Sequence, residues 1–206
     1  MEITAITPQA KDKTRCSIYV DGRFYCGLTL ETTVRNRLKV GQSVSAEYLN
    51  EIQLESEKRT AFDKALTHLT ATQKTEKEIR DFLAKKGYLP ATVDYVMEKL
   101  RGYNFVNDSD YAKAYVTAKS TKKGERLIRM ELRAKGIADT DAAEALSGID
   151  EETQILSAKA VLEKYVRGKT MDVPTLQKAY RHLLSKGYSY DVAKSALSAL
   201  GELDEM

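Results

Sequence analysis

The sequence contains few of the side chains that perform acid–base or metal chemistry near neutral pH. Its 206 residues include two histidines, His68 and His182, two cysteines and no tryptophan. Neither histidine lies at a short spacing from other metal-binding residues. Complete phosphate-loop, GxGxxG and GxSxG motifs are also missing. We therefore expect a protein that is not an enzyme and that holds no metal or cofactor.

Long apolar runs and a strong excess of one charge are absent as well. No stretch approaches the ~20 apolar residues that cross a membrane, and the first residues lack the apolar core of a signal peptide. With 33 basic and 30 acidic side chains, the formal net charge is only +3. This even balance does not indicate a nucleic-acid-binding protein, so any positive surface must be local. We expect a soluble, cytoplasmic protein without membrane association.

A weak internal repeat is the most informative feature that is present. The motif Leu-x-x-Lys-Gly occurs at residues 83–87, 132–136 and 183–187, so its glycines lie 49 and 51 residues apart. Repeats of this length are typical of units that stack on copies of themselves to complete their core. We predict a mainly α fold of three tandem three-helix repeats in an elongated, curved array, preceded by a small β-hairpin segment. The segments are residues 1–43, 44–106, 107–150 and 151–206.

Each repeat is predicted to have the order helix, helix, Lys-Gly turn, helix. The turn glycine supplies the left-handed backbone residue that commonly ends a helix. Thr75 and Glu78 have the spacing of a capping box, which predicts a helix over about 76–86, and Pro90 suits the start of the next one. Ser45 is the expected N-cap of the first helix. The other predicted helices start near 108 and 140 and span about 125–135, 151–165, 174–186 and 189–200.

Residues 1–43 have the pattern of a β-containing segment with one hairpin. Asp-Gly at residues 21–22 suits a two-residue hairpin turn. Without a bulge, the resulting register places Cys16 and Cys26 on opposite faces of the sheet, so we expect reduced cysteines. A short helix over about 30–38 completes the segment. Such a small piece is unstable alone and is expected to pack on the helical part of the chain.

One local run of positive charge differs from the balanced background. Residues 113–135 contain eight lysines and arginines and two glutamates, a net charge of +6. Arg126, Arg129 and Arg133 fall within ~60° around a predicted helix, and Lys122 and Lys123 lie just before its start. The residues equivalent to the three arginines are Lys77, Arg80 and Ala84 in the first repeat and Gln177, Tyr180 and Leu184 in the third. The repeat therefore does not require arginine there, which favours a binding surface over a merely solvated face.

The chemistry of this stripe leaves two kinds of partner open. Guanidinium groups bind phosphates and carboxylates alike, so nucleic acid and an acidic protein surface both fit. Tyr103, Tyr111 and Tyr115 lie near the run, and such rings stack on unpaired bases. Tyr111 and Tyr115, however, share a helical spacing with Ala114 and Ala118, which favours a place in the core.

Several short motifs resemble the signature of the RecX regulatory family. They are Leu132–Ile137 with the preceding Lys123-Gly124 and Ile128, Asn107–Ala112, and Lys85–Tyr88. Together they cover about residues 55–205. The resemblance implies three tandem three-helix units in a curved molecule and a partner, the filament of the RecA recombinase on single-stranded DNA. It also implies inhibition of strand exchange, ATP hydrolysis and co-protease activity, with effects on recombinational repair and the SOS response.

The resemblance predicts what the positive stripe contacts, and its motifs do not cover the N-terminal part of the chain. The residues expected to face acidic recombinase surface or exposed DNA phosphate are Lys122, Lys123, Arg126, Arg129 and Arg133. Residues 1–43 lie outside the recognised motifs and are taken as an N-terminal extension. Two other interpretations stay open: a stand-alone helical module that binds single- or double-stranded DNA, and a purely structural helical scaffold. We expect a monomer.

Overall fold

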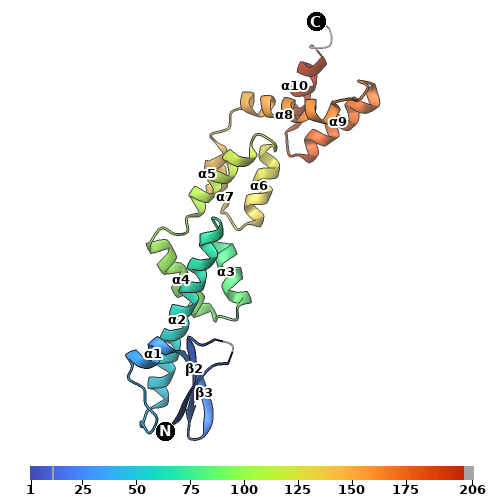
Figure 1. Ribbon diagram of the computed structural model, residues 1–206. Coiled ribbons are helices and arrows are strands. Elements are labelled where there is room, and N and C mark those ends of the chain that lie inside the picture. The colour runs from blue at the N-terminus through green and yellow to red at the C-terminus, as the bar shows by residue number, and fades with distance from the viewer. Residues whose placement is uncertain (11, 202–206) are drawn as a thin grey trace. The chain divides into compact units, whose positions relative to one another are not determined.

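The structure of this protein is a computed structural model that describes residues 1–10 and 12–201. These residues form three strands and ten helices (Figure 1). They divide into two compact units, one containing residues 1–73 and 79–105, the other residues 74–78 and those from 106 onward. The prediction of a mainly helical fold of three-helix repeats behind a β segment is confirmed.

The N-terminal segment forms a three-stranded antiparallel sheet in the order β1-β2-β3. The strands are Ile3–Pro8, Arg15–Val20 and Arg23–Thr29. The turn between β2 and β3 is the predicted one. Asp21 and Gly22 have φ of 48° and 79°, and a tight hairpin turn of this type needs two left-handed residues in succession.

The two cysteines share one face of this sheet, so the prediction of opposite faces is wrong. Near the turn Tyr19 lies opposite Phe24, but a bulge then shifts the register and Ile18 pairs with Cys26. One extra residue in β3 moves every later side chain of that strand to the other face. Cys16 and Cys26 are therefore buried in one core, and both carry free thiols.

Helix α1 (Leu30–Arg35) is shorter than the predicted helix over 30–38. The hydroxyl of Thr29 accepts a hydrogen bond from the Thr32 amide and caps its start. Arg37 has φ of 50°, a left-handed conformation that an α-helix cannot contain, so the helix ends before it.

Helix α2 (Ala46–Ala71) joins the sheet to the first repeat. Ser45 caps it as predicted, since its hydroxyl accepts a hydrogen bond from an amide in the first turn at 3.1 Å. Leu49 and Ile52 are buried in the core of the sheet, and the same helix packs on α4 (Pro90–Gly102). The β segment thus packs on the helical part of the chain, as expected from its small size.

Helix α3 (Glu76–Lys85) begins at the predicted capping box. The Thr75 hydroxyl accepts a hydrogen bond from the Glu78 amide at 3.2 Å, and the Glu78 carboxylate accepts one from the Thr75 amide at 3.1 Å. Two amides that a helix start leaves without intrahelical partners are thereby satisfied.

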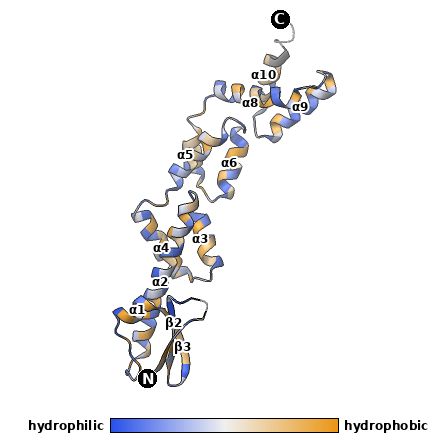
Figure 2. Ribbon diagram, in the orientation of Figure 1, coloured by the Kyte–Doolittle hydropathy of each residue, from blue (hydrophilic) through white to orange (hydrophobic). Residues whose placement is uncertain are grey.

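Six helices form most of the second unit. They are α5 (Asp108–Lys119), α6 (Glu125–Ala134), α7 (Asp139–Leu146), α8 (Glu151–Val166), α9 (Val173–Ser185) and α10 (Tyr190–Gly201). Their starts lie within one residue of the predicted ones. Apolar and polar residues are mixed along the helices (Figure 2), and where buried residues are four apart, as Ile128 and Leu132 are in α6, one side of the helix is available for a core.

The buried face of α5 differs from the predicted one. Ala112 and Val116 are buried with residues of α6 and α7, whereas Ala114 and Ala118 are exposed. The two neighbouring tyrosines pack half-buried against the same core, as predicted. The prediction for the alanines is wrong because two pairs of small residues on this helix have the same i, i+4 spacing, and only docking selects between them.

The three Lys-Gly turns share one backbone conformation. The φ angle is 87° at Gly87, 86° at Gly136 and 88° at Gly187. A residue with a Cβ is strained in this region, whereas glycine is not. The prediction that the three glycines close corresponding turns is confirmed.

Candidate interaction surface

The second and third repeats meet where the last Lys-Gly turn contacts the start of α6. The Gly124 amide donates a hydrogen bond to the Lys186 carbonyl at 2.9 Å, and the Arg126 amide donates one to the Gly187 carbonyl at 3.2 Å. A Cβ on Gly187 would lie 2.9 Å from the Leu127 Cα and overlap the Leu127 Cβ. A Cβ on Gly124 would overlap the backbone of the turn. Glycine at both positions therefore allows the two main chains to touch.

An equivalent contact joins the turn of the second repeat to the start of α3, within the same unit. The Thr75 hydroxyl donates a hydrogen bond to the Lys135 carbonyl at 2.7 Å, and a Cβ on Gly136 would lie 2.5 Å from the Lys77 Cβ. Thr75 corresponds to Gly124 and Lys135 to Lys186, each at the spacing of the repeat. We call these two contacts the repeat joints. Gly87 differs, because apart from its own chain neighbours no heavy atom of the described residues lies within 4 Å of where its Cβ would be.

Lys135 connects the joint at α3 to the tyrosines of α5. Its ammonium group pairs with the Glu78 carboxylate at 2.7 Å and lies 5.5 Å and 6.0 Å from the ring centres of Tyr111 and Tyr115. Burial disfavours the charged form of Glu78, but hydrogen bonds from Lys135 and from the Thr75 amide outweigh it and lower the pKa of this carboxyl group. The aromatic rings therefore lie beside the joint, against its lysine.

Lys123, one of the five predicted site residues, belongs to a neighbouring internal network. It pairs with Glu131, which also accepts a hydrogen bond from the Tyr115 hydroxyl at 2.8 Å. Burial and this hydrogen bond raise the pKa of Tyr115 to about 12. Burial alone would raise the pKa of Glu131, but the hydrogen bonds from Lys123 and Tyr115 reverse its effect and lower it. Glu131 of α6 thus binds both Lys123, in the loop before this helix, and Tyr115 of α5.

The three predicted arginines differ in the partners that they already have. Arg129 pairs with Glu125 at 2.6 Å and Arg133 pairs with Asp139 at 2.6 Å. Arg126 is exposed and forms no ion pair with any residue that the structure describes. The predicted stripe is therefore one guanidinium without an ion pair at the start of α6, followed by two that already pair with carboxylates.

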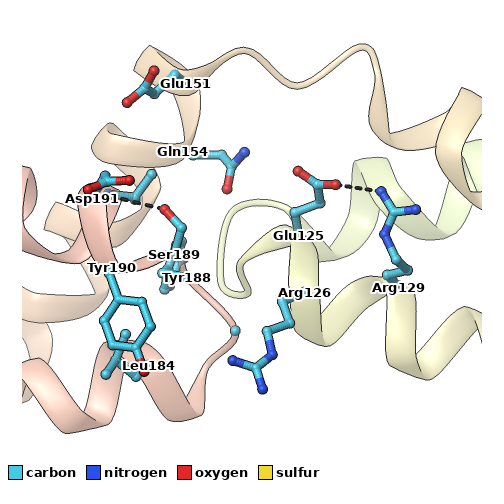
Figure 3. A pocket seen from close by; sticks show the side chains of 12 residues that line it. Glu125, Arg126, Arg129, Glu151, Gln154, Leu184, Tyr188, Ser189, Tyr190 and Asp191 are labelled. Carbon is cyan, nitrogen blue, oxygen red and sulfur yellow. Dashed lines mark hydrogen bonds and ion pairs between the residues drawn. The ribbon is translucent and has the colours of Figure 1, made fainter.

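Arg126 and Arg129 line an open groove of about 670 Å³ between the second and third repeats (Figure 3). Its carboxylates are Glu125, Glu151 and Asp191, and its most exposed aromatic ring is Tyr190, which is 66% exposed. Two cationic and three anionic groups give this lining a formal charge of −1. The groove is therefore of mixed charge, which the basic run in the sequence did not indicate.

Lys122 lies in a different hollow of about 330 Å³. The other residues that line it are Val161, Lys164, Tyr165, His182 and Lys186. The rings of Tyr165 and His182 stack with centres 4.4 Å apart. Burial, Lys186 and Lys169 lower the pKa of His182, which is consistent with a positive field. This hollow has three ammonium groups and no lining carboxylate. The sequence did not reveal it, because the third repeat contributes most of its residues.

Metal-binding clusters and membrane-spanning helices are both missing from the described part of the chain. No group of three or more histidine, cysteine, aspartate or glutamate side chains there is arranged to hold a metal ion. No described helix is long and apolar enough to span a membrane.

Models of RecX domains match three parts of the chain. The RecX N-terminal domain matches residues 1–45, the first three-helix domain matches residues 61–100, and the second matches residues 107–146. The β segment is therefore part of the family's own fold, and its interpretation as an extension outside that fold is wrong.

Relatives cover nearly the whole length of the chain. Regulatory protein RecX of Clostridium perfringens (strain SM101 / Type A) is 33% identical over 203 residues, which cover 97% of this chain and 96% of that protein. Regulatory protein RecX of Bacillus subtilis (strain 168) is 33% identical over 202 residues, or 96% and 76% of the two chains.

Solved structures agree with these relatives. A crystal structure of regulatory protein RecX matches with a TM-score of 0.68 at 28% identity, covering 94% of this chain and 97% of the other. That of RecX from Lactobacillus salivarius matches with a TM-score of 0.65 at 27% identity, covering 73% and 98%. The fold, the three domain models and these relatives together place the chain in the RecX family of regulatory proteins.

Proposed function

We propose that this protein binds the filament of a RecA recombinase on single-stranded DNA and inhibits it. The inhibited activities of the recombinase are strand exchange, ATP hydrolysis and its co-protease activity. Their inhibition limits recombinational repair and the SOS response. Membership of a family of regulatory proteins supports this function. The protein acts by binding rather than by catalysis.

The mixed charge of the groove beside Arg126 is the observation that favours a protein partner. Its lining offers guanidinium groups, carboxylates and an exposed tyrosine. A protein surface presents charges of both signs and can complement such a lining, whereas a phosphate backbone presents only one. Arginine and tyrosine are also the side chains that most often dominate protein interfaces.

The ion pairs on α6 do not prevent its arginines from binding a partner. The side chains of Arg129 and Arg133 remain 42% and 73% exposed in their pairs. Exposed pairs of this kind stabilise a protein by about 1 kcal/mol or less. Both arginines can therefore exchange their internal carboxylate for one on the recombinase, and Arg126 needs no exchange. Lys123 supports this surface from within instead of contacting the partner.

The repeat joint fixes the two walls of the groove relative to each other. Its backbone hydrogen bonds connect the start of α6 to the turn before α10, and each of these elements contributes one wall. A surface that is already ordered loses less conformational entropy when it binds. The joint therefore supports recognition of a rigid filament by the second and third repeats together.

The test is ATP hydrolysis by the recombinase on single-stranded DNA at rising concentrations of this protein. We expect Arg126→Glu to raise the half-inhibitory concentration at least about tenfold, equivalent to ~1.4 kcal/mol. Arg23→Glu, the same charge change at an exposed position of the hairpin, serves as the matched control and should inhibit like the unaltered chain. No inhibition by the unaltered chain at saturation, or equal effects of both variants, contradicts the proposal.

A stand-alone nucleic-acid-binding module is the second candidate, favoured by the all-basic hollow around Lys122. The two candidates differ in how DNA binding without recombinase responds to salt. A module that displaces several counterions shows tight binding and a steep slope of log K against log salt concentration. Weak binding with a shallow slope favours the recombinase regulator.

A further inference from the structure

The Lys-Gly turn of the first repeat has no helix start packed on it in the described part of the chain. In the second and third repeats the turn belongs to a repeat joint, where its lysine carbonyl accepts a hydrogen bond from Thr75 or Gly124. The Lys86 and Gly87 carbonyls accept no hydrogen bond from any described residue. The three turn glycines have the same φ angle within 2°, so the first turn presents the acceptors of a joint whose other half is missing.

The residues that follow this turn are also less covered than their equivalents. Ile137 and Tyr188, each directly after a turn glycine, are 3% and 2% exposed, whereas Tyr88 is only half-buried. Leu89 comes next and is 63% exposed, while the other two repeats have alanine and serine at this place. A large apolar side chain therefore lies in solvent beside the unused carbonyl groups.

The two repeat joints define what such a turn binds. The first amides of a helix have no partner in their own helix and carry a positive partial charge, so they suit carbonyl acceptors. The residue that caps the helix is small, Thr75 at α3 and Gly124 at α6. Both helices have glutamate in the first turn, and at α3 one of these glutamates pairs with Lys135. Lys86 is the equivalent of Lys135 and forms no ion pair with any described residue.

The last repeat of a second copy does not supply the missing half. Helix α9 takes the place of α3 and α6 in the third repeat, but its second residue is Pro174, which has no amide to donate. In α6 the second residue is Arg126, whose amide binds the turn. The Thr175 amide is already bound to the Asp172 carboxylate at 2.9 Å. The start of α9 thus differs from the two that enter joints, which favours another protein as the occupant.

We propose that the first Lys-Gly turn binds the start of a helix in the recombinase, in the way that the other two turns bind α3 and α6. This inference rests on the proposed function and names a contact for it in the first unit. The recombinase helix has a small cap residue, donates its first amides to the Lys86 and Gly87 carbonyls, and places an acidic side chain near the Lys86 ammonium group. Leu89 packs against it. A DNA phosphate does not fit the carbonyl groups, because both can only accept hydrogen bonds.

A side chain at the turn glycine should block this contact. Asparagine tolerates the left-handed backbone better than most residues with a Cβ, so Gly87→Asn is expected to fold. A Cβ on Gly187 would overlap Leu127 of α6, and a side chain on Gly87 would meet the incoming helix in the same way. We expect the half-inhibitory concentration for ATP hydrolysis by the recombinase filament to rise about tenfold or more, equivalent to ~1.4 kcal/mol. Lys86→Glu should raise it as well, because it repels the acidic side chain.

The matched control is Gly41→Asn in the β segment. Gly41 has φ of 85°, and apart from its chain neighbours no heavy atom of the described residues lies within 4 Å of where its Cβ would be. The backbone strain and the open space are therefore those of Gly87, and this variant should inhibit like the unaltered chain. Equal inhibition by Gly87→Asn and Gly41→Asn overturns the inference alone. No inhibition by the unaltered chain overturns the proposed function together with it.

Crosslinking identifies what occupies the turn. The photoreactive residue p-benzoylphenylalanine replaces Leu89 in one variant and Val173, which is 66% exposed at the start of α9, in its control. After irradiation with the recombinase filament on single-stranded DNA, mass spectrometry locates the attached peptide. Attachment of the Leu89 variant, and not of the Val173 variant, to the first turn of a recombinase helix supports the inference. Attachment of the Leu89 variant to DNA, to a second copy of this chain or to another part of the recombinase refutes it.

Discussion

Two glycines in corresponding turns allow the contribution of a repeat joint to be measured. Gly87 and Gly187 have φ of 87° and 88°, so alanine is strained equally at both. Only Gly187 touches another repeat, whereas the space beside Gly87 is open. The difference between Gly87→Ala and Gly187→Ala therefore isolates the joint from the cost of the left-handed backbone.

The expected loss in the free energy of unfolding depends on the contacts that each alanine would make. The left-handed conformation costs about 1–2 kcal/mol for a residue with a Cβ. At Gly187 the new Cβ would lie 2.9 Å from the Leu127 Cα, where ordinary contacts begin at 3.4 Å. Relieving the overlap separates the two backbones and stretches the hydrogen bonds that the Gly124 and Arg126 amides donate. Overpacking then costs a further ~1–3 kcal/mol, and each lost hydrogen bond costs ~1 kcal/mol more. We expect a loss of about 1–2 kcal/mol for Gly87→Ala and at least about 3 kcal/mol for Gly187→Ala.

Urea unfolding followed by circular dichroism measures the total loss, and hydrogen exchange locates it. The Gly124 amide donates to the Lys186 carbonyl, so it should exchange much faster in Gly187→Ala and at the original rate in Gly87→Ala. Equal losses of stability in the two variants, or an unchanged Gly124 amide in Gly187→Ala, would refute the reasoning.

Three further predictions concern groups of the joint and of the sheet. Thr75→Val should destabilise the protein by about 2–3 kcal/mol in urea unfolding, because it removes a helix cap and leaves the Lys135 carbonyl without its donor, whereas Thr75→Ser should retain most of the stability. The pKa of Glu78 is lowered in the folded state, so its ionised carboxylate stabilises the fold fully above the unfolded pKa of about 4.5, and this stabilisation is lost as pH falls through the folded pKa. Between pH 7 and pH 3 the thermal unfolding temperature should therefore fall less in Glu78→Gln than in the unaltered protein. Burial raises the pKa of Cys26 to about 11, so iodoacetamide should modify Cys26 and the buried Cys16 slowly before unfolding and fully in urea, and rapid reaction of the native protein would contradict this.

The features predicted correctly from the sequence are those that neighbouring residues determine. Ser45 and Thr75 cap helices because their hydroxyls reach amides three residues ahead, and this depends on no other part of the chain. Gly136 and Gly187 end helices for a similarly local reason. The bulge that brings Cys16 to the same face as Cys26 was missed because it depends on how the sheet packs on α1 and α2.

The candidate surface was found only in part. Arg126 of the basic run lines the groove, and the pairing of Arg129 with Glu125 is expected from their spacing of four residues. Glu151 and Asp191 lie in the first turns of α8 and α10, where acids are common, so the sequence does not single them out. Their position beside Arg126 depends on how two repeats dock, and docking is decided by contacts between residues far apart in the chain.

The joint between the second and third repeats is made by the main chain, and this affects which residues can change in evolution. Its hydrogen bonds run from backbone amides to backbone carbonyls, and its close approach needs only the missing side chains of Gly124 and Gly187. The outward residues of α6 are therefore not needed to form this joint. A mutation there can change which partner the protein binds without changing how its repeats pack. A chain can therefore acquire a new specificity one repeat at a time.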